Sequence, residues 1–499
     1  MKTTSNSFLK FESPIIRFSQ EPKDFWTLSD ALRGTQIFGG IGSGKTSGSG
    51  AMISKAFLEN NFGGIVLCAK PDEVENWKRV AALTGRTKDL IIFNEDSPYR
   101  FNPLDYETNR SGKGAGETFN LVSLFMNIYQ MGRNVSGEGL SRENDRFWDN
   151  AMKRSLKRMI DLLKLAKEPV SIRNMHRIIL DAQKTDDIEE IMQASTDKNL
   201  ENGQRKISEI GNYYGICIMK AIRNYASKNT SLKDQQKMEW ELQLIINYFN
   251  REFAKLSDRT RTIIVESFLG IAEPFLGGML KEFFAGGTSD EIKPEVCFDG
   301  KIIVLDFPIK NYLEMGVYVQ GIYKLLWQQA MERRSFKDGR DRPVFLWVDE
   351  SQMFLNDYDQ IFQTTARSSG TATVYLSQNI SNYYAAIGGR NPTAKVDSLL
   401  ANLSTKIFHS NNDAVTNEWA AQTIGKSFRI IESFNVGEQT SAGASKQFHY
   451  QVEPVKFSVL KSGISDDEDK LEFGTYITVA NRRWSNGKNF ITYTFEKYI

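Results

Sequence analysis

Residues 39–46 read Gly-Gly-Ile-Gly-Ser-Gly-Lys-Thr, and this stretch decides the fold. It matches the pattern G-x-x-x-x-G-K-[ST] in full, and it stands between an apolar segment at residues 35–38 and a helix-forming segment at residues 46–60. The glycines let the backbone curl so that successive N–H groups converge on phosphate oxygens, and the following helix adds the positive end of its dipole. The predicted nucleotide-binding residues are Gly39, Gly40, Ile41, Gly42, Ser43, Gly44, Lys45, Thr46 and Ser47.

Two side chains of this loop carry chemistry. Lys45 is expected to reach the β- and γ-phosphates, where its charge also supports catalysis. The Thr46 hydroxyl is expected to ligate Mg²⁺. The sequence therefore predicts ATP and Mg²⁺ as the bound groups.

Short apolar runs on both sides of the loop predict the rest of the fold. They are bounded by turn residues and alternate with helical segments, as strands of a buried parallel sheet do. The predicted strands cover residues 35–38, 63–68, 90–93, 301–306, 344–349, 373–377 and 404–408. Residues 474–480 and 489–495 flank a Ser485-Asn486-Gly487 turn and predict a terminal hairpin. The fold class is α/β, with a mainly parallel sheet.

A middle region has a different pattern. A glycine-rich patch at residues 111–116 opens it, and helical periodicity follows at residues 147–163 and 240–256 without a convincing strand. We predict an all-α inserted domain at residues 111–261. The nucleotide-binding domain then consists of residues 1–110 and 262–499.

An acid pair follows the strand at residues 344–348. Its sequence is Val-Phe-Leu-Trp-Val, and Asp349 and Glu350 come next, at the carboxyl edge where α/β sites lie. Asp349 is expected to hold Mg²⁺, and Glu350 is expected to orient and polarise the attacking water. Asp306 also ends an apolar strand, but it lacks a second acid and Pro308 follows it closely. The pair at 349–350 is therefore preferred.

Two later residues complete a predicted hydrolysis site. Gln378 follows the strand at residues 373–377, where a polar side chain can contact the γ-phosphate. Arg367 lies 17 residues after Glu350, where an arginine offered to a neighbouring subunit can stabilise charge on the γ-oxygens. The predicted catalytic residues are Lys45, Glu350, Arg367 and Gln378.

Composition and net charge restrict which classes of binding partner and which cellular location the sequence supports. The chain has 499 residues, and 63 Lys plus Arg against 61 Asp plus Glu give a net charge of +2. A net charge near zero indicates neither nucleic-acid binding nor membrane binding, although a local basic surface is compatible with it. No stretch approaches the roughly 18 apolar residues of a membrane helix, and no signal-peptide core is present. We expect a cytoplasmic protein, with Cys68, Cys217 and Cys297 as buried free thiols and its three histidines in no metal cluster.

The order of these motifs resembles that of the TraD/TraG coupling proteins of conjugative type IV secretion, which belong to the FtsK/HerA class of P-loop ATPases. The resemblance covers roughly residues 25–430. The segments that carry it are Trp26 to Ala31, Lys70-Pro71-Asp72-Glu73, Arg100 to Leu104, Asp299 to Leu305, Asp349-Glu350, Arg367 and Gln378. Ala69 stands where the family has an aspartate.

The resemblance implies a RecA-like core and a hexameric ring that binds DNA with little sequence preference. It also implies that ATP hydrolysis moves DNA, or a protein–DNA substrate, toward a secretion channel, with a relaxase or accessory protein on the all-α domain. Typical members begin with membrane helices, whereas only 38 residues precede Gly39 here and none of them forms such a helix. Either this version docks on a separate membrane partner, peripherally at the inner membrane, or it serves another process.

Two other functions stay open. One is DNA pumping by an FtsK/HerA-like ATPase in phage defence or genome packaging. The other is a nucleotide-gated docking adaptor for secreted proteins. The candidate DNA-binding face of the helical insertion, Lys153, Arg154, Lys157 and Arg158, can equally be a solvated basic surface.

Overall fold

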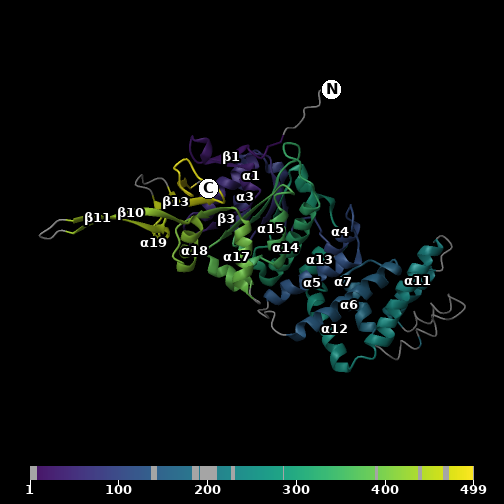
Figure 1. Cartoon of the computed structure of the whole chain (residues 1–499). Coiled ribbons are helices and arrows are strands. Elements are labelled where there is room, and N and C mark those ends of the chain that lie inside the picture. Colours follow the sequence, from purple (N-terminus) through teal and green to yellow (C-terminus); the bar gives the residue numbers. More distant parts are fainter. Residues whose placement is uncertain are drawn as a thin grey trace, which may run out of the picture. The chain divides into compact units, whose positions relative to one another are not determined.

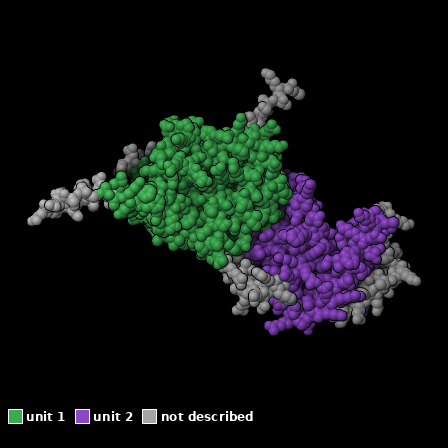
Figure 2. Space-filling model, in the orientation of Figure 1, with its two compact units in different colours: residues 1–97, 294–499 green, residues 98–293 purple. Residues whose placement is uncertain are grey.

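The computed structural model describes residues 8–135, 143–182, 190, 211–225, 231–284, 286–387, 391–435, 441–464 and 471–497. The chain forms two compact units, coloured separately in Figure 2. Unit 1 consists of residues 1–97 and 294–499, and unit 2 consists of residues 98–293.

Unit 1 is built on a ten-stranded sheet in the order β12-β13-β9-β3-β8-β7-β4-β6-β5, with β14 paired to β13 (Figure 1). The strands from β9 to β5 pair in parallel. The strand bounds are β3 Thr35–Phe38, β4 Gly63–Leu67, β5 Leu90–Phe93, β6 Ile302–Leu305, β7 Val344–Val348, β8 Thr371–Ser377, β9 Thr405–Phe408, β12 Ser462–Ile464, β13 Leu471–Val479 and β14 Ile491–Glu496. The predicted α/β fold and mainly parallel sheet are confirmed.

The central strands are buried on both faces, which is why their sequences are continuous apolar runs. Every residue of β3, β4, β6, β7 and β8 is buried. On one face, an aromatic cluster packs against α2 (Ala51–Glu59) and α3 (Asp72–Leu83), with the rings of Trp77 and Phe345 5.4 Å apart and Trp347 edge-on to Trp77. This packing fixes the strand ends from which the site residues project.

Helices and short helical turns connect the strands of unit 1. The P-loop leads into a π-helical segment, η2 (Lys45–Gly50), which continues as α2 (Ala51–Glu59). The other helices are α1 Leu28–Ala31, α3 Asp72–Leu83, α14 Ile309–Glu332, α15 Asp357–Thr365, α16 Ile380–Ile387, α17 Pro392–Asn402, α18 Ala414–Ile424 and α19 Val455–Ser458.

The carboxyl-terminal strands extend the sheet in the antiparallel sense. β13 pairs with both β9 and β14, so the predicted hairpin is present and joins the main sheet. Two smaller antiparallel pairs were not predicted: β1 (Pro14–Arg17) with β2 (Phe25–Thr27), and β10 (Lys426–Asn435) with β11 (Ser441–Tyr450). In Figure 1, β10 and β11 leave the rest of unit 1 as a narrow ribbon.

The described residues of unit 2 form helices and connecting loops, with no strand among them. Its helices are α4 Pro103–Asn109, α5 Thr118–Val135, α6 Glu143–Leu165, α7 Ile172–Asp181, α10 Tyr213–Tyr225, α11 Leu232–Asn247, the π-helical segment η4 Tyr248–Phe253, α12 Asp258–Ala272 and α13 Gly278–Phe284. Tyr214, Phe249 and Phe253 lie in its buried core. Side-chain caps at Ser171, Ser231 and Ser257 start three of the helices.

The helical unit extends beyond the predicted bounds of 111 and 261 at both ends. Its two ends are tied to each other by backbone and side-chain hydrogen bonds. The N–H of Phe101 donates to the carbonyl of Phe283, and the Asn102 amide donates to the carbonyl of Gly286 at 2.7 Å. These contacts join the segment that leads into α4 to the end of α13 and the residues after it, in agreement with unit bounds at 98 and 293 rather than at the glycine-rich patch.

The three cysteines are buried free thiols, as predicted. Burial raises the pKa of the Cys68 thiol well above its usual range. No helix in the described part of the chain is long and apolar enough to span a membrane.

Candidate nucleotide site

The P-loop is held in a conformation that requires glycine. Gly44 has φ +81°, and a Cβ built there would fall 2.1 Å from the ring of Phe473 on β13. A larger residue would therefore face both backbone strain and a steric collision. His409 also supports the loop, because its ring nitrogens lie 2.7 Å from Ser49 Oγ and 2.9 Å from the carbonyl of Ser43.

His409 is neutral at physiological pH. Burial lowers its pKa to about 3. Because the carbonyl of Ser43 can only accept, Nδ1 carries the proton and Nε2 is free to accept from the Ser49 hydroxyl. The sequence predicted only that His409 belongs to no metal cluster, so its contact with the P-loop was missed.

The structure brings the predicted metal-site residues together across 303 positions of sequence. The Thr46 hydroxyl donates to Asp349 Oδ2 at 2.9 Å. The N–H of Glu350 donates to the other oxygen of Asp349 at 2.8 Å. Asp349 and Glu350 are both buried, and Glu350 adopts φ +45°. A non-glycine residue in this region is strained, which is common at functional sites.

The Glu350 carboxylate is surrounded by donors. Lys70 Nζ lies 2.7 Å from Oε1, Gln352 Nε2 lies 3.0 Å from Oε2, and Lys45 Nζ lies 3.9 Å from Oε1. Burial by itself raises the pKa of Glu350, but the hydrogen bonds from Lys70 and Gln352 and the charge of Lys45 outweigh it, so the net pKa is lowered. Glu350 is therefore ionised at neutral pH.

Gln378 reaches the same carboxylate from the neighbouring strand. Its Nε2 lies 3.4 and 3.5 Å from the two oxygens of Glu350. Its backbone carbonyl accepts a hydrogen bond from Asn411 at 2.7 Å, which fixes the segment after β8. The structure thus brings the side chains of Lys45, Glu350 and Gln378 together.

The set-aside competitor Asp306 and the predicted catalytic residue Arg367 lie elsewhere. Asp306 accepts a hydrogen bond from Asn94 at 3.1 Å and directly follows β6, which lies two strands away from β7. Arg367 precedes β8, so it lies at the amino end of the parallel strands, whereas the P-loop lies at their carboxyl end. Arg367 is exposed, and its guanidinium stacks over the ring of Phe11. It does not join the site of its own chain.

The site residues line a cavity of 1180 Å³ at the carboxyl edge of the sheet. It includes the P-loop from Gly40 to Ser47, the acid pair, Gln378 and Lys70. Drug-sized ligands occupy cavities of about 300–1,000 Å³, so the space is sufficient for a nucleotide. Lys70 and Gln352 line the cavity and His409 supports the loop beside it, and the motifs had assigned a role to none of these three residues.

The donor set fits Mg²⁺ bound together with a nucleotide. Magnesium in such sites uses one or two protein oxygens, phosphate oxygens and water. The Thr46 hydroxyl and Asp349 carboxylate are adjacent, and a buried oxygen of Glu73, a close electrostatic neighbour of Asp349, has no hydrogen-bond partner. Within the described ranges, no group of three or more His, Cys, Asp or Glu side chains could hold a metal ion.

No family model and no curated protein sequence matches the chain. The fold matches solved structures of the bacterial conjugative coupling protein TrwB. The unbound form is 12% identical with a TM-score of 0.53, covering 99% of this chain and 89% of that one. The complex with the GTP analogue GDPNP is 13% identical with a TM-score of 0.51, covering 98% and 90%. The complex with the ATP analogue ADPNP is 12% identical with a TM-score of 0.50, covering 100% and 90%. The chain has the TrwB fold, a P-loop fold of the RecA type.

Proposed function

We propose that this protein is a Mg²⁺-dependent ATPase of the coupling type, which moves DNA or a protein–DNA substrate toward a conjugation or type IV secretion channel. One observation carries the proposal. A complete P-loop faces Asp349 and Glu350, with Thr46 hydrogen-bonded to Asp349, in a chain that has the fold of a conjugative coupling protein. TrwB structures hold both an ATP and a GTP analogue, so the choice of ATP is part of the proposal.

The proposed chemistry is hydrolysis of the bond between the β- and γ-phosphates. Lys45 and the P-loop N–H groups hold the phosphates, and Thr46 and Asp349 hold Mg²⁺, which neutralises charge on the phosphate oxygens when bound. Glu350 orients a water molecule and takes its proton as the water oxygen attacks the γ-phosphorus. The bridging P–O bond breaks, giving ADP and inorganic phosphate. Gln378 steadies Glu350 and offers its amide to the γ-phosphate.

Assembly into a homohexamer completes the proposed site. Arg367 is exposed at the opposite edge of the sheet from its own P-loop, so it can act only on the nucleotide of another subunit. An arginine supplied in trans is worth about 10³–10⁵ in rate in GTPases. A relaxase or accessory protein would dock on unit 2, and a separate membrane partner would localise the ring.

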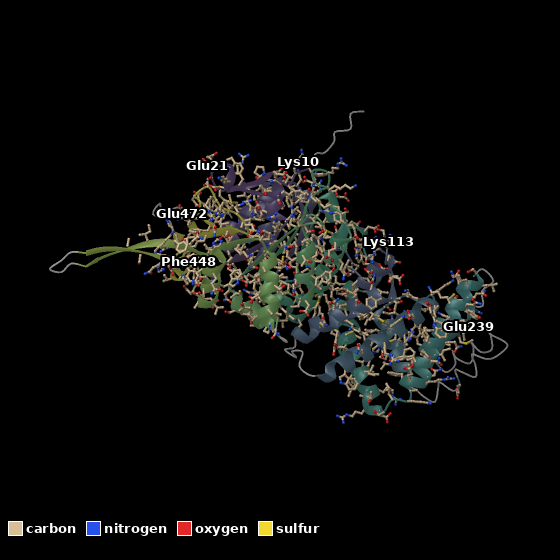
Figure 3. All side chains as sticks on the ribbon, in the orientation of Figure 1. Lys10, Glu21, Lys113, Glu239, Phe448 and Glu472 are labelled. Atoms are coloured by element: carbon tan, nitrogen blue, oxygen red, sulfur yellow. The ribbon has the colours of Figure 1, made fainter. Side chains whose placement is uncertain are left out.

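The proposed DNA contacts lie on the β10–β11 ribbon rather than on α6. On α6, Arg154 is paired with Glu252, and Lys157 with Asp161 at 2.8 Å, so the predicted basic face is partly neutralised. The register pairs Phe428 with Phe448, which places both rings on one face of the ribbon. They are 63% and 58% exposed, and Phe448 is labelled in Figure 3.

Cations accompany these rings. Lys446 Nζ lies 4.7 Å from the centroid of Phe428, and Lys426 Nζ lies 4.5 Å from that of Tyr450. No carboxylate occurs among the ribbon's described side chains, residues 426–430 and 444–450. Exposed aromatic rings with cations between them are the pattern that binds nucleic acid through base stacking and phosphate contacts.

The test is the ATPase rate with and without single- and double-stranded DNA, with particle size measured in parallel. Stimulation by DNA in ring-sized particles supports the coupling motor. Turnover that DNA does not change, together with no DNA binding at low salt, would instead favour the docking adaptor.

A further inference from the structure

Lys70 and Glu350 meet across 280 positions of sequence. Their strands are neighbours, because β4 pairs with β7 and Leu67 lies opposite Val348. Lys70 is the third residue after β4, and Glu350 is the second residue after β7. The two side chains therefore leave the same edge of the sheet and meet at 2.7 Å.

The pair is asymmetric in its surroundings. The Glu350 side chain is 5% exposed and the Lys70 side chain is 29% exposed, so the carboxylate depends on its partner more than the ammonium does. Burial lowers the pKa of Lys70, but the charge of Asp349 and the hydrogen bond to Glu350 outweigh it and raise the pKa overall. Lys70 is therefore a cation at neutral pH.

Lys45 cannot serve Glu350 in the same way. Lys45 Nζ lies 3.9 Å from Glu350 Oε1. In the proposed function, the positive charge of Lys45 is used to bind the phosphates. A carboxylate beside a triphosphate repels it unless another cation compensates it. Lys70 is the cation that is in contact with Glu350 and does not belong to the P-loop.

We propose that Lys70 is a positioning residue that fixes Glu350 and cancels its charge when a triphosphate enters the cavity. The inference rests on the proposed role of Glu350 as the residue that orients the attacking water. Lys70 acts through Glu350 and makes no contact of its own with the nucleotide. Its loss should therefore matter only while Glu350 carries a charge.

A double-mutant cycle tests this with a binding measurement that needs no turnover. The proteins are wild type, Lys70→Met, Glu350→Gln and the double variant, titrated with a fluorescent ATP analogue and Mg²⁺. Lys70→Met should weaken nucleotide binding roughly tenfold to 100-fold, because a buried charge is left unpaired. In the Glu350→Gln background the same change should cost less than about twofold, since no charge remains to be compensated.

Turnover gives a second measurement. Lys70→Met should lower kcat, and Lys70→Arg should recover most of both kcat and affinity. Lys78→Met is the matched control, because Lys78 pairs with Glu75 on the exposed surface of α3. This substitution should change neither kcat nor nucleotide affinity. Melting curves of all variants report whether each is folded.

Three results would overturn the inference. Equal losses of affinity in both backgrounds would mean that Lys70 contacts the nucleotide itself. Unchanged binding by Lys70→Met would mean that Glu350 needs no counter-ion. If the wild-type protein binds no nucleotide, both this inference and the proposed function are wrong. Wild type that binds ATP without hydrolysing it would contradict the proposed function alone, and the binding cycle would still decide the role of Lys70.

Discussion

Removing one partner of a buried ion pair in unit 1 should strongly destabilise the fold. Lys324 on α14 donates to both oxygens of Asp359 on α15, at 2.8 and 2.7 Å, and to the carbonyl of Phe354 at 2.5 Å. The two side chains are 0% and 1% exposed. Asp359 also accepts from Tyr375 at 2.8 Å. The network ties α14, α15 and β8 together just after the Glu350 turn.

Lys324→Met keeps the side chain's length and removes its charge. Asp359 is then left as an uncompensated buried carboxylate, a loss that typically costs about 3–5 kcal/mol. The double variant Lys324→Met with Asp359→Asn removes both charges and should recover part of that loss. Guanidinium unfolding followed by fluorescence measures the change.

Lys310→Met is the control, because Lys310 is an exposed lysine near the start of the same helix. It should stay within about 0.5 kcal/mol of wild type. The reasoning is refuted if Lys324→Met loses less than about 1 kcal/mol, or if the double variant is no more stable than the single one.

Three further outcomes are expected. Arg367→Ala should bind ATP but turn it over slowly, and mixing it with Lys45→Ala should restore activity through mixed interfaces; an absence of rescue in mixed rings would contradict the arginine in trans. Replacing Lys426, Arg429 and Lys446 by Gln should lower DNA affinity and reduce the slope of log K against log salt by about two to three, whereas replacing Lys153, Arg154 and Lys157 should change the slope less. Burial lowers the pKa of Lys406 from 10.5 to about 8. Between these two pH values the folded protein binds fewer protons than the unfolded chain. The free energy of unfolding should therefore rise with pH across that window. Lys406→Met should be more stable than wild type at pH 7, and thermal melts should show the difference shrinking toward pH 10.5.

The parts of the site that the sequence predicts are those that a local pattern encodes. The P-loop is eight consecutive residues, and Asp349 and Glu350 follow directly after a five-residue apolar strand. Buried parallel strands are apolar throughout, so the sequence predicts their positions. Because the strands are parallel, their carboxyl ends lie at the same side of the sheet. For these reasons Thr46, Asp349, Glu350 and Gln378 could be grouped without a structure.

The parts that were missed depend on pairings between distant residues. Nothing near Lys70 in sequence indicates a carboxylate partner 280 positions away. His409 gave no metal-like spacing, and its contact with the P-loop arises because β9 pairs with β3. The sequences of the ribbon strands mix polar and apolar residues, and none of the described ribbon side chains is buried, so the strands lack the continuous apolar pattern of the central strands.

The fate of bound nucleotide in Glu350→Gln and Lys45→Ala tests the central claim most directly. Wild type and both variants are incubated with labelled Mg-ATP, and the nucleotide that stays bound is separated and identified. Glu350→Gln should retain ATP and hydrolyse it about 100-fold or more slowly than wild type, because only the water-orienting carboxylate is lost. Lys45→Ala should retain little nucleotide of either kind. Hydrolysis by Glu350→Gln at the wild-type rate would contradict the assignment of the acid pair as the hydrolytic centre.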